Sequence, residues 1–210
     1  MNSKVNLKID WCTHEAAKYA CEHWHYSKCM PVGKIVKIGA WENGKFIGCV
    51  LFSRGATPML LKPYNLTQYQ GCELTRIALT SHHSPVSKIL AIALKFLKRN
   101  SPGLRLIISF ADPSEGHHGG IYQATNWILT GKSSDAKFAL VNGKEVHPRT
   151  VSSMRKSGKN PTKWIIKPGK WRYLMPLDEE MRKQIQPLSK PYPKRAPKAE
   201  DSMRLSSTEE

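Results

Sequence analysis

One stretch in the middle of the chain constrains the fold most, because two strands and an amphipathic helix follow one another there. Glu73–Leu79 predicts a strand, and an apolar stripe predicts a helix over 85–99, with Ser84 as its N-cap and Pro85 in its first turn. Leu104–Phe110 is apolar apart from one arginine, which is typical of a central buried strand. We therefore expect a sheet covered by helices.

The N-terminal third contains a helix and a hairpin. Thr13 is expected to cap a helix that runs to about His25, since apolar residues recur there at spacings of three and four. Two β-rich runs, 34–41 and 45–53, flank an Asn-Gly pair, which is the strongest short-range signal for a β-hairpin. Residues 54–70 are rich in polar residues, glycine and proline, and they predict a long loop.

The C-terminal half is more polar, and its elements are predicted mainly from turn signals. A short helix is expected over 121–127 and a strand from 128 to 130. A turn at 142–143, a Ser/Gly/Asn-rich loop at 152–161 and a hairpin through 168–169 are expected to follow.

Length and composition indicate one soluble globular domain over 1–186 and a disordered tail over 187–210. No run approaches the 18 or so apolar residues of a membrane span, and the N-terminus lacks an apolar signal core. The five cysteines are an odd number, which does not suggest a disulfide framework. A cytoplasmic protein with reduced thiols is therefore expected, without a membrane partner.

The charge balance predicts a polyanionic partner. The chain has 33 Lys and Arg against 16 Asp and Glu, a formal net charge of +17, and the segment 137–172 alone holds ten basic residues against one acid, Glu145. This segment is the expected surface for DNA, although a basic face can also serve only for solubility. The expected DNA-binding residues are Arg149, Arg155, Lys156, Lys159 and Lys163. Trp164, Trp171 or Tyr173 could stack on an extruded base or pack in the core.

Three strings are similar to the Mom family of phage DNA-modifying proteins. They are His23–Lys28 (HWHYSK), Leu74–Arg76 (LTR), and Ser109–Pro113 (SFADP) continuing through a Gly-His pair to Tyr122. The similarity covers about residues 10 to 175, and the order of elements also resembles the acetyltransferase (GNAT) fold. It implies an α+β fold whose central mixed, mostly antiparallel sheet is flanked by helices, with a basic C-terminal extension. The implied activity is transfer of a carbamoylmethyl group to adenine N6 in double-stranded DNA, which would protect phage DNA from restriction.

The chemistry of the implied reaction suggests roles for particular residues. Adenine N6 is a poor nucleophile until a base takes its proton, and Asp112, which follows the buried strand, is the predicted base; its alternative role is to form a turn or cap a helix. The resemblance to acetyltransferases implies that Tyr122 donates a proton to the leaving group; its alternative is a packed tyrosine with a satisfied hydroxyl. The resemblance also implies catalytic roles for His25 and Tyr26. The expected substrate-binding residues are Arg76, Ser109 and His117.

Cofactors are not fixed by the sequence. Acetyltransferases cradle the coenzyme A pyrophosphate in a Gly-rich loop after the central strand, whereas Thr80–Ser84 contains no glycine, so an acyl-coenzyme A donor is in doubt. The helix start at Pro85 could still hold an anion, either from a donor or from DNA. The resemblance implies iron as an option, for which His25, His117 and Asp112 would form a ligand set. Cys21, His25 and Cys29 have the spacing of zinc ligands, but no metal is predicted.

Two alternatives to the DNA-modifying transferase stay open. One is an N-acetyltransferase acting on a protein, an RNA or a small amine, against which the missing glycine loop counts. The other is a basic DNA-binding accessory protein that kept the fold without the chemistry. The group donor, the target sequence and the oligomeric state are left open, and a homodimer is one assembly that the sequence allows.

Overall fold

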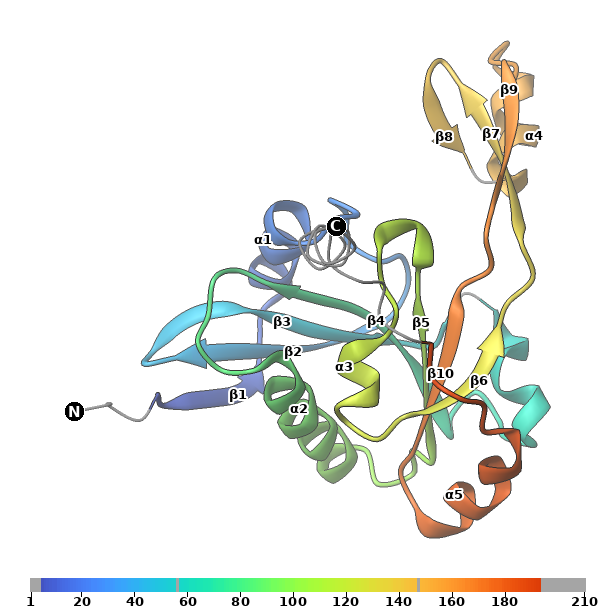
Figure 1. Cartoon of the computed structure of the whole chain (residues 1–210). Helices are drawn as coiled ribbons and strands as arrows, with labels where there is room; N and C mark the ends of the chain where they lie inside the picture. Colours follow the sequence, from blue (N-terminus) through green and yellow to red (C-terminus); the bar gives the residue numbers. More distant parts are fainter. Residues whose placement is uncertain (1–4, 56, 147, 194–210) are drawn as a thin grey trace, which may run out of the picture.

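The computed structural model describes residues 5–193 apart from 56 and 147, and within them the main sheet has seven strands in the order β1-β2-β3-β4-β5-β10-β6 (Figure 1). These strands are β1 Leu7–Trp11, β2 Ile35–Glu42, β3 Lys45–Ser53, β4 Gly71–Leu79, β5 Leu106–Ala111, β10 Trp171–Pro176 and β6 Ile128–Lys132. Neighbouring strands are antiparallel except β4 and β5, which are parallel. The predicted fold class, a mixed and mostly antiparallel sheet flanked by helices, is confirmed.

Helices cover both faces of this sheet. They are α1 His14–Trp24, α2 Val86–Asn100, α3 Gly120–Gln123 and α5 Glu179–Ile185. Side chains alternate along a strand, so Cys49 and Leu51 of β3 pack with α1, whereas Val50 and Phe52 join the cluster formed with α2. In the part of the chain that the structure describes, no helix is both long and apolar enough to cross a membrane.

The parallel pair β4 and β5 opens along its length. Its hydrogen-bonded register runs from Gly71 opposite Leu106 to Leu74 opposite Ser109, although both strands continue beyond that point. On the other side of β4, the register with β3 shifts at Leu51, leaving Thr75 as an extra residue whose hydroxyl donates to the Leu51 carbonyl at 3.0 Å. A bulge of this kind changes the direction of the side chains that follow it. The sheet therefore has a gap in its pairing directly beside a bulge.

A second, three-stranded sheet projects beyond the edge of the main sheet at β6 and β10 (Figure 1). Its order is β8-β7-β9, and together with a helix it forms what we call the arm. The elements of the arm are β7 Ala136–Val141, β8 Lys144–Val146, α4 Pro148–Lys156 and β9 Lys163–Lys167. The arm has its own small core, made of the buried residues Ala139, Val141, Val146 and Val151. It is continuous with the main sheet through two crossing segments, β6 to β7 and β9 to β10.

Two predictions for this region were wrong. The expected loop at 152–161 is helical up to Lys156, because Val151 and Met154 form an apolar face that packs on the arm sheet. The expected hairpin through 168–169 is a crossing between sheets, since β9 pairs with β7 and β10 pairs with β5 and β6. The crossing is fixed by the Gly169 backbone N–H, which donates to the Asp135 carboxylate at 2.8 Å.

The helix cap before α2 was also predicted wrongly. The N-cap residue is Pro85, and no side chain caps the helix. Ser84 is instead buried, with its backbone N–H donating to Glu42. By contrast, Thr13 caps α1 as predicted, and Asn43-Gly44 forms the predicted hairpin turn, with φ of 50° and 81° at these two positions.

The beginning of the segment expected to be a disordered tail lies against the main sheet. The Lys190 backbone N–H donates to the Leu129 carbonyl at 2.8 Å, and the Tyr192 hydroxyl donates to the Trp127 carbonyl at 2.6 Å. Residues 194–210 of that segment lie outside the described residues.

Candidate active site

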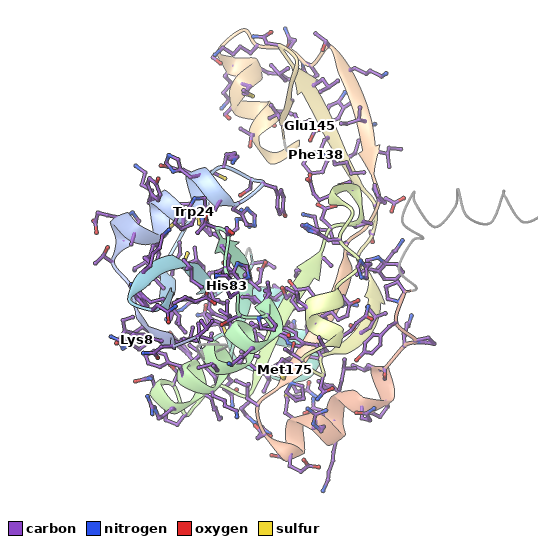
Figure 2. All side chains as sticks on the ribbon, turned by 60° about the vertical axis from the view of Figure 1, so that its left-hand side comes forward. Lys8, Trp24, His83, Phe138, Glu145 and Met175 are labelled. Carbon is purple, nitrogen blue, oxygen red and sulfur yellow. The ribbon has the colours of Figure 1, made fainter. Side chains whose placement is uncertain are left out.

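A pocket of about 780 Å³ lies where β4 and β5 separate. Its walls are the end of α1 with the residues that follow it, the C-terminal halves of β4 and β5, and a glycine-rich loop, 116–120, that leads into α3. Five residues expected in the site line it: His25, Tyr26, Arg76, His117 and Tyr122. In Figure 2 the arm, with Phe138 and Glu145 labelled, projects from the same end of the view as α1, where Trp24 is labelled.

His25 ends α1 and is buried to all but 8% of its surface. Its Nδ1 accepts the Ser27 backbone N–H at 3.1 Å and lies 2.8 Å from the Ser27 hydroxyl, so in the neutral ring the proton is on Nε2, the nitrogen left for a ligand. Burial, together with the charge of Arg76, lowers the pKa of His25 to about 4. The imidazole is therefore neutral at physiological pH. It can accept a proton at Nε2 only in the other tautomer, in which Nδ1–H donates to the Ser27 hydroxyl.

Tyr26 connects the two sides of the pocket mouth. Its ring lies 4.2 Å from the His25 ring and 5.3 Å from the His117 ring, with which it makes an edge-on contact. Tyr26 is 48% exposed, and His117 is exposed as well. An exposed aromatic ring at the mouth of a pocket offers a surface on which a planar group can stack.

Arg76 follows the bulge in β4 and brings a positive charge to the pocket. One of its terminal nitrogens donates to the Thr75 carbonyl at 2.8 Å. Its Nε is buried and has no hydrogen-bond partner among the described residues. A buried donor without a partner is costly, so this N–H is suited to an acceptor oxygen of a ligand.

The Tyr122 hydroxyl is held where the pairing of β4 and β5 ends. The Ser109 hydroxyl lies 2.8 Å from it and 2.9 Å from the Leu74 carbonyl. A carbonyl can only accept, so the one proton of Ser109 goes to Leu74, and Tyr122 donates to Ser109. Burial raises the pKa of Tyr122 to about 12. Tyr122 is thus protonated at neutral pH, and its hydroxyl is satisfied inside the protein.

A glycine at the start of α3 allows the pocket wall to approach the core. Gly119 has φ of +82°, and a Cβ there would lie 2.3 Å from the Tyr173 ring. The Tyr173 hydroxyl donates to the His118 carbonyl at 2.8 Å, and this fixes the loop that carries His117. Tyr173 is fully buried, so it cannot stack on a base as the sequence had allowed.

Asp112 does not line the pocket. One of its carboxylate oxygens accepts hydrogen bonds from the backbone and the hydroxyl of Ser114, and the other lies 2.8 Å from the Lys170 ammonium. Burial opposes ionisation, but the hydrogen bonds from Lys170 and Ser114 outweigh it and keep the pKa of Asp112 below its usual range. Asp112 therefore caps a turn and forms an ion pair. Its predicted role as the base stays a prediction.

The two metal sets considered from the sequence are not assembled. Cys21 is buried against Cys49 while Cys29 is exposed, and Asp112 is turned to Lys170. Across 5–55, 57–146 and 148–193, no three His, Cys, Asp or Glu side chains are arranged to hold a metal ion. The residues present therefore do not fit iron or zinc at these positions.

A profile of the Mom protein family matches residues 6–194. The chain belongs to the Mom protein family. One relative is the methylcarbamoylase Mom of Escherichia phage Mu, which is 24% identical over 203 residues, covering 90% of this chain and 84% of the relative. The family resemblance drawn from the three sequence strings is thus confirmed.

Solved structures with this fold include acetyltransferases. An aminoglycoside acetyltransferase in complex with coenzyme A superposes with a TM-score of 0.52 at 10% identity, over 86% of this chain and 99% of the other. The same acetyltransferase with coenzyme A and kanamycin also gives a TM-score of 0.52, at 11% identity and the same coverage. These similarities support the acetyltransferase-like fold of this Mom family member.

The DNA-binding residues expected from the sequence lie on the arm of this Mom family member, and the side chain of Arg149 is outside the described residues. The exposed residues among them are Arg155, Lys156, Lys159 and Lys163, and none forms a salt bridge within the described part of the chain. By contrast, Lys167 is paired with Glu145 at 2.5 Å.

The other two aromatic residues expected to stack on a base differ in exposure. Trp164 on β9 is 38% exposed, with Lys137 over its ring at 5.2 Å. Trp171 is half-buried, and Lys132 lies 4.2 Å above its ring.

Two residues near the pocket were missed as site residues. His82 lines the pocket, and its Nδ1 donates to the Thr80 carbonyl at 2.6 Å, which leaves its Nε2 free to accept. Glu42 occupies the turn just before α2, next to the helix start where the sequence allowed an external anion. The pair His82-His83 was visible in the sequence, but nothing there connected Glu42 to a loop some 40 residues away.

Proposed function

We propose that this chain transfers a carbamoylmethyl group to adenine N6 in double-stranded DNA and thereby protects phage DNA from restriction. The observation that carries the proposal is the pocket at the separated ends of β4 and β5, which combines a neutral His25 with an Arg76 Nε that has no hydrogen-bond partner among the described residues. Membership of the Mom family and the name of the phage Mu relative, a methylcarbamoylase, support it. The basic arm supports DNA as the substrate.

In the proposed reaction, N6 attacks the methylene carbon of an electrophilic carbamoylmethyl donor. The new N–C bond forms as the bond from the methylene carbon to the leaving group breaks, and the leaving group departs with that electron pair. His25 takes the N6 proton through Nε2 from the tautomer in which Nδ1–H donates to the Ser27 hydroxyl, and this requires the Ser27 backbone N–H to give up Nδ1. A base of low pKa suffices here, because the proton on N6 becomes strongly acidic as the nitrogen lone pair is used.

Arg76 is proposed to bind an oxygen of the donor. Its buried Nε–H needs an acceptor, and the charge of the guanidinium favours an anionic or strongly polar oxygen. Since Arg76 also lowers the pKa of His25, it keeps the base neutral until the reaction.

Asp112 is proposed to position the loop that carries His117. Its carbonyl accepts the His117 backbone N–H at 3.1 Å, and its carboxylate caps the turn through Ser114. For Asp112 to act as the base, Lys170 would have to leave and the carboxylate would have to turn into the pocket. We therefore rank His25 above Asp112 as the base.

The arm is proposed to hold the DNA backbone while one adenine leaves the stack. An enzyme cannot reach N6 inside a duplex without widening the groove or extruding the base, and extrusion costs a few kcal/mol that backbone contacts offset. Arg155, Lys156 and Lys159 supply exposed positive charge for these contacts. Tyr26, exposed at the pocket mouth, is proposed to stack on the extruded adenine.

Protection from restriction tests this function. Plasmid DNA from cells that express the chain should resist restriction enzymes whose sites contain a modified adenine, and DNA from cells with His25→Ala should be cut. His23→Ala is a matched control, because His23 is exposed on the same helix and its ring contacts Tyr19. Equal protection by wild type and His25→Ala would remove His25 as the base, and cleavage in every case would contradict the function.

A further inference from the structure

A carboxylate of the protein itself occupies the turn that leads into α2. The two oxygens of Glu42, at the end of β2, accept the backbone N–H groups of His83 at 2.9 Å and of Ser84 at 2.6 Å. The Ser84 hydroxyl also donates to this carboxylate. Glu42 is buried, and His83 is labelled in Figure 2. Glu42 is thus bound by backbone N–H groups of the turn that leads into α2, as an anion is bound in a loop before a helix.

This arrangement leaves no free backbone donor at three successive positions. The N–H groups of His83 and Ser84 are taken by Glu42, and Pro85 has none. Burial opposes ionisation of Glu42, but the hydrogen bonds from His83 and Ser84 outweigh it and lower the pKa to about 2. The negative charge is therefore present at every pH at which the protein would be assayed.

The same place in the fold matters for coenzyme A. In acetyltransferases, backbone N–H groups of a Gly-rich loop after the central strand hold the coenzyme A diphosphate, and the solved relatives of this fold contain coenzyme A. Here β4 is followed by Thr80–Ser84, which has no glycine and is bonded to Glu42. A diphosphate would meet a buried negative charge where it needs donors, so the residues present do not fit coenzyme A.

We propose that Glu42 takes the place of the donor's diphosphate and is the residue that excludes coenzyme A thioesters from this pocket. The group donor is then a small molecule without a nucleoside diphosphate, which is held from the pocket side by Arg76. This inference rests on the proposed function, from which it takes the premise that the pocket binds a molecule that donates the transferred group. Its test is a binding measurement that needs no activity, so its failure is distinguishable from failure of DNA modification.

The test is titration of the full chain with coenzyme A by calorimetry. Wild type should show no saturable binding at millimolar concentrations. Glu42→Ala frees the two N–H groups and removes the charge, so it should bind coenzyme A saturably, with an affinity about tenfold or more above the limit set by wild type. Glu42→Gln removes the charge but keeps one acceptor, so it should bind more weakly than Glu42→Ala. Glu179→Gln, an exposed acid on α5, is the control and should behave as wild type.

The titrations have distinct outcomes for and against the role of Glu42. Saturable binding of coenzyme A by wild type would overturn the proposal. Absence of binding by wild type, Glu42→Gln and a folded Glu42→Ala alike would also overturn it, because Glu42 would not be the excluding residue. If Glu42→Ala does not fold, a gain of binding by Glu42→Gln over wild type supports the proposal, and no gain overturns it. Circular dichroism of each variant establishes folding before titration.

Discussion

Replacing Arg155, Lys156 and Lys159 together with alanine should weaken DNA binding and should make the affinity that remains less sensitive to salt than that of wild type. All three side chains are exposed on α4 or directly after it, and none forms a salt bridge within the described residues. Each lost phosphate contact lowers the magnitude of the slope of log K against log salt by about 0.9, so three contacts lower it by about 2.7. Between about 50 and about 200 mM salt, the affinity of wild type should therefore fall ~40-fold more than that of the variant.

A control with the same change in net charge separates a DNA-binding surface from general attraction. Alanine at Lys45, Lys62 and Lys183 also removes three exposed positive charges, but from the β2–β3 turn, the segment Pro58–Tyr64 and α5, which do not belong to the arm. Fluorescence anisotropy with a labelled duplex at several salt concentrations gives both slopes. If the two triple variants have the same slope, or if the arm variant keeps the wild-type slope, the arm is not where the DNA binds.

Three further predictions concern the pocket. In an NMR titration, His25 should stay neutral down to about pH 4. Because its pKa is lower in the folded protein than in the unfolded chain, the free energy of unfolding should fall as the pH drops from about 6.5 toward about 4. Protonation of His25 near pH 6.5 would contradict this. Gly119→Ala should lower the free energy of unfolding by about 3 kcal/mol, because the added Cβ would overlap the Tyr173 ring, whereas Gly116→Ala, where a Cβ has open space, should lower it by about 1 kcal/mol. Equal urea midpoints for the two variants would contradict this. Asp112→Asn should reduce, not abolish, modification in cells, and complete loss with an intact loop would restore Asp112 as the base.

Local chemistry explains which elements could be predicted from the sequence. The Thr13 cap and the Asn43-Gly44 turn depend on a few neighbouring residues, so their signals are complete within a short window. The apolar stripe of α2 and the apolar run of β5 are equally local. These elements were predicted to within one or two residues.

The arm shows where local signals end. α4 has only Val151 and Met154 as an apolar face, among serines and basic residues, and it depends on the neighbouring sheet for its core. The proline and glycine at 168–169 indicate a change of direction, but pairing decides which sheet each flanking strand joins. Strand pairing is a long-range property that a single sequence does not carry.

The site residues could be predicted mainly because three short sequence strings resemble the Mom family, and less from the physical properties of the residues themselves. His25, Arg76 and Tyr122 come from three separate elements, and only the fold brings them to one pocket. Contacts between distant residues, such as Glu42 with Ser84 and Lys170 with Asp112, were invisible because neither partner has a distinctive local signal. These contacts change the chemistry most, since one fills the turn before α2 with a carboxylate and the other holds the expected base in an ion pair.

The most direct test of the central claim is nucleoside mass spectrometry of DNA from cells that express this chain. We expect a fraction of deoxyadenosine to be replaced by a nucleoside in which one N6 hydrogen has given way to a carbamoylmethyl group, and we expect this product to be absent with His25→Ala. Unmodified deoxyadenosine in cells that make folded protein, or a modification on another base, would contradict the account.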